Sequence, residues 1–159
     1  QKPKYIITGI AGKKGFCSVG IDKAKMNSEI GFCRKVLTVF EDNGISIEHM
    51  PSGIDTVTVI VRNKYVNQEK EEILINRIKN EAGAQLVTVE RNLAIVMIAG
   101  QAMENSVGIM ARAASALSAA GINLKIVNQG ASEISMMFGV GAEYCDYAVR
   151  ALYKELFKI

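Results

Sequence analysis

The 159-residue chain has no tryptophan, only two prolines and three cysteines, and a single histidine, His49. With one histidine, neither a Ser–His–Asp set nor a zinc-binding cluster is expected. The cysteines, Cys17, Cys33 and Cys145, are odd in number, lack metal-site spacing and lie in apolar stretches. We therefore predict that all three are buried free thiols in a reducing cytoplasm.

Long apolar runs and clusters of one charge sign are also lacking. No hydrophobic run approaches the length that spans a bilayer, and the net charge of +3 is spread among acidic residues. P-loop and GxGxxG motifs are absent too. We predict a cytoplasmic protein that binds neither membrane nor nucleic acid. Because the chain begins at Gln1, inside a predicted strand, we expect a fragment of a longer protein.

What the sequence does contain is a repeated phrase, NGISIEHMPSG at 43–53 and AGINLKIVNQG at 120–130. An offset of 77 residues maps Gly31 onto Gly108 and Gly44 onto Gly121. The same offset maps the alternating residues Val57, Val59 and Val61 onto Ile134, Met136 and Phe138. Matching glycines and matching strand phase predict a duplicated structural unit.

Hydrophobic periodicity predicts the elements of each copy. In the first copy they are strands at 16–21, 45–50, 56–61 and 85–90 and helices at 30–43 and 68–81; in the second, strands at 93–99, 122–128 and 133–140 and helices at 107–120 and 143–157. A further strand at 5–11 precedes a predicted hairpin turn, GKKG.

This order predicts an α+β fold of two ferredoxin-like βαββαβ modules. The first module would span residues 13–91 and the second 92–159. The second lacks its last strand, whereas the first has one strand too many. We therefore predict that the strand at 5–11 completes the second module and interlocks the two.

Each predicted first helix begins near a glycine, Gly31 or Gly108, that follows an Asn–Ser pair. Side-chain capping by Asn or Ser is one interpretation. The other is a docking site for a small anion on the backbone N–H groups, which a glycine leaves unshielded. In the first copy Glu48 and Asp55 could accept from an ammonium group, as a free amino acid requires, whereas the second copy has Lys125 in place of Glu48. Glu48 could equally be only an exposed strand residue.

The run MNSEIGFCRKVLTVFEDNGISIEHMPSGID at 26–55 resembles paired ACT domains, and most closely the regulatory half of bacterial, lysine-sensitive aspartate kinases. That resemblance implies a non-catalytic fragment that binds lysine, with threonine as a second effector, where two first modules meet in a homodimer or higher even oligomer. It also implies a kinase domain elsewhere in the parent chain, which would bind ATP and Mg²⁺; this fragment would need no cofactor. A purely structural dimerisation module stays open as the alternative.

By the same resemblance, the residues matching the effector-site segments are Met26, Glu29, Phe32, Cys33, Ile47, Glu48, Ser52 and Asp55. Beside Gly31, the backbone N–H groups of Phe32 and Cys33 would hold the α-carboxylate of the effector. The Glu48 carboxylate would meet an ammonium group.

Overall fold

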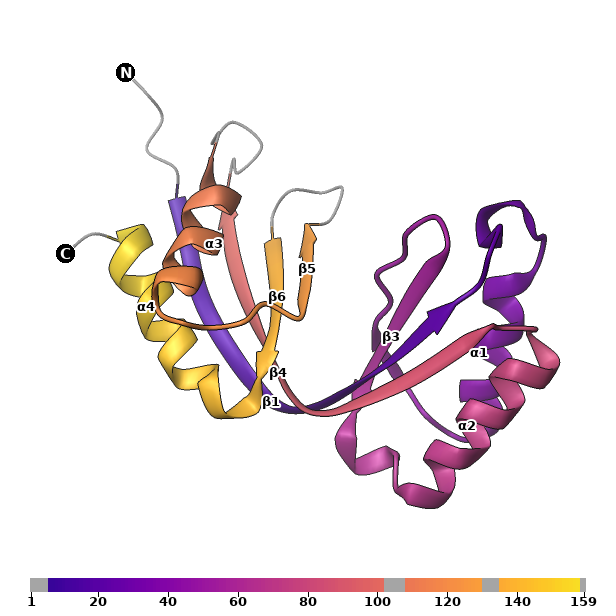
Figure 1. The fold of residues 1–159 in the computed structure, drawn as a ribbon. Coiled ribbons are helices and arrows are strands. Elements are labelled where there is room, and N and C mark those ends of the chain that lie inside the picture. Colours follow the sequence, from indigo (N-terminus) through magenta and orange to yellow (C-terminus); the bar gives the residue numbers. More distant parts are fainter. Residues whose placement is uncertain (1–5, 102–107, 130–134, 158–159) are drawn as a thin grey trace. The chain divides into compact units, whose positions relative to one another are not determined.

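A computed structural model describes residues 6–101, 108–129 and 135–157 (Figure 1). The chain forms two compact units. The first unit is Gly15–Asn92, and the second combines Gln1–Lys14 with Leu93–Ile159. The first residues of the chain therefore belong to the same unit as the last ones. Among the described residues no helix is both long and apolar enough to cross a membrane.

The first unit has the strand order β2-β3-β1-β4, in which β1 and β4 contribute only the parts that lie within Gly15–Asn92. β3 is antiparallel to both β1 and β2. Its elements are β1 (Ile6–Asp22), a 3₁₀ turn (Met26–Ser28), α1 (Phe32–Asp42), β2 (Ile47–His49), β3 (Thr56–Arg62), a 3₁₀ turn (Asn63–Tyr65), α2 (Gln68–Glu81) and β4 (Leu86–Gln101).

The second unit repeats this plan with the order β1-β4-β6-β5, using the remaining parts of β1 and β4. It adds α3 (Ile109–Ala119), β5 (Ile126–Gln129), β6 (Ser135–Gly141), a 3₁₀ turn (Ala142–Tyr144) and α4 (Cys145–Phe157). The predicted fold class is confirmed, including the N-terminal strand that completes the second module. The exact module bounds, 13–91 and 92–159, stay a prediction.

Each unit buries one face of its strands beneath two helices (Figure 1). In the first unit alternate residues of β3 point into the core, as expected for side chains that alternate across a sheet. They meet the apolar faces of both helices; this core includes Val57, Val59 and Val61 of β3, Val36, Val39 and Phe40 of α1, and Leu74 and Ile78 of α2. A separate cluster that includes Ile7 of β1 forms the core of the second unit.

The predicted hairpin turn at GKKG is wrong, because β1 runs unbroken from Ile6 to Asp22. Likewise β4 is one strand where the sequence predicts two. Each strand passes between the units at a residue in the left-handed region, Gly15 with φ of 92° and Asn92 with φ of 57°. Such a residue changes the local direction of a strand without ending it, so the turn signals in the sequence mark a local distortion and no reversal.

The 77-residue offset holds only for the first half of each unit. Phe16 pairs with Arg62 across β1 and β3, and Leu93 pairs with Gly141 across β4 and β6. Leu93 lies 77 residues after Phe16, whereas Gly141 lies 79 residues after Arg62. The segment between α3 and β6 is therefore two residues longer than its counterpart. The structural equivalents of Val57, Val59 and Val61 are Met136, Phe138 and Val140, which corrects the mapping based on the sequence.

Candidate effector site in the first unit

The start of α1 is a helix end without a side-chain cap. Gly31 occupies the N-cap position with φ of 83°, and no side chain accepts from the first-turn N–H groups within the described residues. Ser28, a candidate cap, instead donates its hydroxyl to the carbonyl of Lys25 at 2.9 Å. The capping interpretation is therefore wrong for this helix. The N–H groups of Phe32 and Cys33 keep the capacity to bind an anion.

The second unit repeats this geometry at α3. Gly108 is the N-cap with φ of 90° and no side-chain cap. The Glu104–Val107 segment that precedes it lies outside the described residues, and so does Ser132 of the second-copy turn. Only the first unit therefore offers a complete description of the candidate site.

Asp55 ties the β2–β3 turn to the segment that precedes α1. Its Oδ1 atom accepts from the N–H of Lys25 at 3.1 Å, and its carbonyl accepts from the N–H of Lys23 at 2.8 Å. Lys25 itself has φ of 59°, which is uncommon for a residue with a side chain. These contacts place the Asp55 carboxylate at the same end of the unit as the helix start.

Glu29 turns toward Lys23 near the helix start. The Lys23 ammonium lies 3.4 Å from Glu29 Oε1 and donates to the carbonyl of Gly83 at 3.1 Å. Glu29 Oε2 is shielded from solvent and has no hydrogen-bond partner in the described part of the chain. The carboxylate is thus half-buried and still has unused acceptor capacity.

Three of the predicted site residues belong to the core of the unit. Met26 is 7% exposed and Phe32 is 1% exposed, and Ile47 packs against the same cluster. Their side chains are used in packing the helix onto the sheet. Phe32 can therefore contribute to a site only through its backbone N–H, as predicted, and Met26 and Ile47 shape the site from beneath.

Glu48 lies on the other face of the sheet. Its neighbour in β2, Ile47, packs against the helical core, so alternation turns Glu48 away from α1 and α2. There Arg62, the last residue of β3, donates from Nε to Glu48 Oε1 at 3.4 Å. The structure therefore does not bring Glu48 together with the helix start inside one copy of the unit.

The remaining predicted residues, Cys33 and Ser52, are exposed. The prediction of three buried thiols is therefore wrong for Cys33, which occupies the first turn of α1 on its solvent side. It is correct for Cys17 and Cys145. Burial raises the pKa of both buried thiols, which keeps them protonated and unreactive.

Sequence reasoning missed the cations that hold the three carboxylates. Lys23 contacts Glu29, the backbone of Lys25 binds Asp55, and Arg62 pairs with Glu48. Only Arg62 carried a usable signal, since it ends a strand that neighbours the strand of Glu48. The other two depend on a loop path that periodicity does not reveal.

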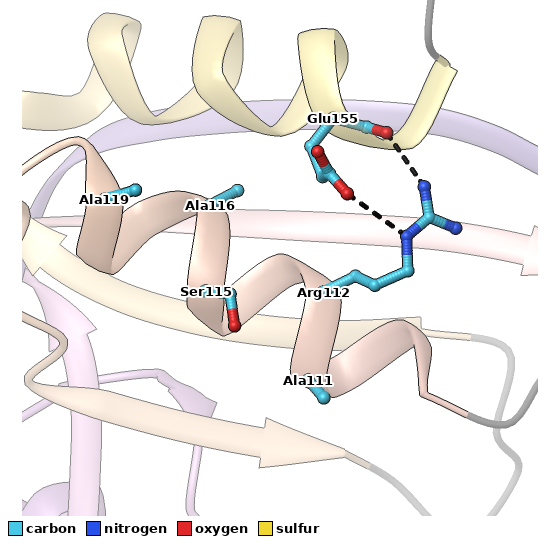
Figure 2. Close-up of a pocket in the computed structure, with 6 residues that line it drawn as sticks. All are labelled: Ala111, Arg112, Ser115, Ala116, Ala119 and Glu155. Carbon is cyan, nitrogen blue, oxygen red and sulfur yellow. Dashed lines mark hydrogen bonds and ion pairs between the residues drawn. The ribbon is translucent and has the colours of Figure 1, made fainter.

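Each unit also has a groove between its two helices. In the second unit the groove encloses about 380 Å³ and is lined by small residues of α3 and by Glu155 of α4. Figure 2 shows the Arg112 side chain bridging the helices at one end of the groove. It donates to the carboxylate of Glu155 at 3.3 Å and to its backbone carbonyl at 2.9 Å.

The groove of the first unit encloses only about 120 Å³. Longer side chains fill it, and Arg77 of α2 closes it by pairing with Asp42 of α1 at 2.8 Å and with Glu81. These contacts hold the pKa of the Glu81 carboxyl below its ordinary value, chiefly through the hydrogen bond from Arg77. The two grooves therefore differ in side chains much more than in backbone.

Comparison with known proteins places these features in a family. A family model for the ACT domain matches residues 96–156. Aspartokinase 3 of Bacillus subtilis is 48% identical over 151 residues, which cover 95% of this chain and 33% of that protein. The chain thus spans about a third of the length of the curated relatives it matches.

Solved structures agree with that relationship. Aspartate kinase of Clostridium acetobutylicum has a TM-score of 0.87 and 37% identity, covering 97% of this chain and 35% of that one. The regulatory subunit of aspartate kinase from Thermus flavus has a TM-score of 0.80 at 21% identity, covering 96% and 99%. Escherichia coli aspartokinase III in complex with lysine and aspartate, in its T-state, has a TM-score of 0.73 at 17% identity, covering 99% and 35%.

The fold and these matches define an ACT-domain protein of the kind that regulates enzymes. More particularly, the chain is homologous to the regulatory region of aspartate kinases and corresponds to a non-catalytic part of such a protein.

Proposed function

We propose that this chain senses an amino-acid effector, with lysine as the first candidate and threonine as the second, and transmits feedback inhibition to an aspartate kinase. The parent enzyme would transfer the γ-phosphate of ATP to the β-carboxylate of L-aspartate. The groups for that chemistry, and the sites for ATP and Mg²⁺, would lie in a kinase domain outside this chain. This fragment would act by binding alone.

The observation that carries the proposal is the uncapped start of α1 beside two carboxylates. The N–H groups of Phe32 and Cys33 and the positive end of the helix dipole suit an α-carboxylate. Glu29 and Asp55 lie at the same end of the unit and suit ammonium groups. The E. coli structure with lysine and aspartate, which shares the fold, supports an amino acid as the ligand class.

We further propose that the complete site forms between two copies of the first unit. β2 is at the edge of the strand order, and an edge strand presents unpaired backbone groups that invite a partner. Glu48 lies on the opposite face from α1, so a ligand that touches both a helix start and Glu48 would take them from different copies. A closed, two-fold symmetric dimer satisfies both requirements.

Thermal unfolding of the chain with each of the twenty amino acids, followed by calorimetry on those that stabilise it, tests the proposal. A ligand at a hundredfold excess over its Kd stabilises the folded state by about 2.7 kcal/mol. We expect lysine to stabilise most, and light scattering to give a dimeric or higher even mass. Heat from threonine alone would refute lysine as effector. No response to any amino acid, with a dimer still present, would leave a structural dimerisation module.

A further inference from the structure

Arg62 is held in place on two sides in the first unit. Its Nε atom lies 3.4 Å from Glu48 Oε1, and its guanidinium carbon lies 5.0 Å from the centroid of the Phe16 ring. Phe16 is buried and stands directly across from Arg62 in the β1–β3 register. A cation over an aromatic face is attracted by the ring, so the guanidinium has two reasons to stay beside Glu48.

This pair changes what an arriving ligand meets at Glu48. The side chains of Arg62 and Glu48 are 27% and 39% exposed, so water screens their attraction only in part. Together they form a nearly neutral pair in place of a bare carboxylate. A ligand with a cationic side chain must share Glu48 with Arg62 or displace it. A ligand with a neutral side chain meets no such competition.

The arrangement is specific to the first unit. The structurally equivalent positions in the second unit hold Leu93 for Phe16, Gly141 for Arg62 and Lys125 for Glu48. Neither the carboxylate nor the guanidinium is preserved there, although the backbone plan is the same. The pair is therefore not a requirement of the fold.

We propose that Arg62 sets the selectivity of this site by competing with cationic effectors for Glu48. The proposal rests on the proposed function, in that an amino acid binds beside Glu48. Arg62 holds the affinity for lysine below the value that Glu48 alone would give, and leaves the affinity for neutral amino acids nearly unchanged. Arg62 is thus a residue that determines specificity by acting on Glu48.

The test is calorimetry on the full chain with lysine, with norleucine, which has the same side-chain length without the ammonium group, and with threonine. Arg62→Met removes the charge but keeps a long side chain over Phe16. We expect lysine to bind about twofold to fivefold more tightly, in line with the strength of partly exposed ion pairs. Norleucine and threonine should change by less than about 1.5-fold, and the gain for lysine should shrink at high salt.

Three further variants separate competition from structural damage. Arg62→Lys keeps the positive charge and should bind lysine about as the original does. Arg62→Gln replaces Arg62→Met if that variant unfolds at a lower temperature. In the Glu48→Gln background the Arg62→Met change should no longer increase lysine affinity, because the contested carboxylate is gone.

The possible outcomes distinguish the role of Arg62 from the proposed function. If the original chain binds lysine and Arg62→Met binds it no better, the role of Arg62 is refuted and the proposed function stands. If the original binds only neutral amino acids and Arg62→Met gains lysine binding, Arg62 is the filter and lysine is not the natural effector. If no variant binds any amino acid, both proposals fall.

Discussion

The two units of this chain have nearly the same backbone and quite different side chains at corresponding places. Left-handed glycines recur at Gly31 and Gly108, where the first helix begins, and at Gly44 and Gly121, where it ends. The apolar residues that bury each sheet recur as well. These positions are fixed by backbone geometry and burial, so they record what the fold needs.

The differences gather where the fold makes no demand. The groove between α1 and α2 is closed by ion pairs of Arg77, whereas small residues leave the groove between α3 and α4 open. Glu48 in β2 corresponds to Lys125 in the second unit. The comparison teaches that a duplicated fold can keep its scaffold while only one copy keeps the charges for an amino-acid ligand.

The largest expected effect concerns the cores, where the units should behave alike. Phe32→Ala and Ile109→Ala each remove a side chain that is 1% exposed. We expect losses of about 3–5 kcal/mol and about 2–5 kcal/mol in unfolding free energy, measured by urea denaturation. Because β1 and β4 run through both units, both variants should shift one common transition. Two separate transitions, with only one shifted, would break this equivalence.

An intermediate effect concerns the two helix starts. Gly31→Ala and Gly108→Ala each force a side chain into the left-handed region, at about 1–2 kcal/mol. Neither added methyl carbon would clash, since the nearest atoms to it are 3.9 Å away at Gly31 and none lies within 4 Å at Gly108. Stability should therefore fall equally, but only Gly31→Ala should weaken lysine binding in calorimetry. Equal loss of lysine affinity in both variants would contradict a functional difference between the units.

A smaller effect is expected in cysteine labelling. Cys33 is exposed at the start of α1, whereas Cys17 and Cys145 are buried with raised thiol pKa values. Iodoacetamide followed by mass spectrometry should modify Cys33 first. Saturating lysine should slow that modification several-fold if the effector lies on the Cys33 backbone, whereas alanine, as a control, should not. Unchanged labelling with lysine bound would place the ligand elsewhere.

The smallest effect concerns the ion pairs that close the first groove. Arg77 lowers the pKa of Glu81 from its ordinary value of 4.5, so the pairing stabilises the fold above that pH and is lost on acidification. Arg77→Gln should therefore lose less thermal stability than the original between about pH 6 and about pH 3. Arg150→Gln, a change at an exposed residue of α4, serves as control. Identical acid profiles for Arg77→Gln and the original would remove this role.

Much of the fold was accessible from sequence because it depends on local periodicity. The predicted helix at 68–81 coincides with α2, since charged residues on one face and apolar residues on the other define it unambiguously. The unbroken β1 and β4 were not predicted, because GKKG and Asn92 carry turn chemistry although the chain only bends there. The change of offset to 79 also escaped, because a short insertion in a turn leaves strand alternation in phase.

The candidate site was only partly accessible. Gly31 and the first-turn N–H groups follow from the helix start, and the structure shows them uncapped. The partners of Glu29, Glu48 and Asp55 come from segments 6 to 30 residues away in sequence, or from a neighbouring strand. Such pairings depend on loop paths and strand register, which a single sequence does not encode in any local pattern.

The central claim is that the first unit, and not the second, supplies the acid that meets the effector. Calorimetry with lysine on Glu48→Gln and on Lys125→Gln tests it most directly. A hydrogen bond to a charged group contributes about 1.5–3 kcal/mol, so Glu48→Gln should weaken lysine binding about tenfold to a hundredfold while Lys125→Gln leaves it nearly unchanged. Lysine binding of unchanged affinity in Glu48→Gln, or an equal loss in both variants, would contradict the account.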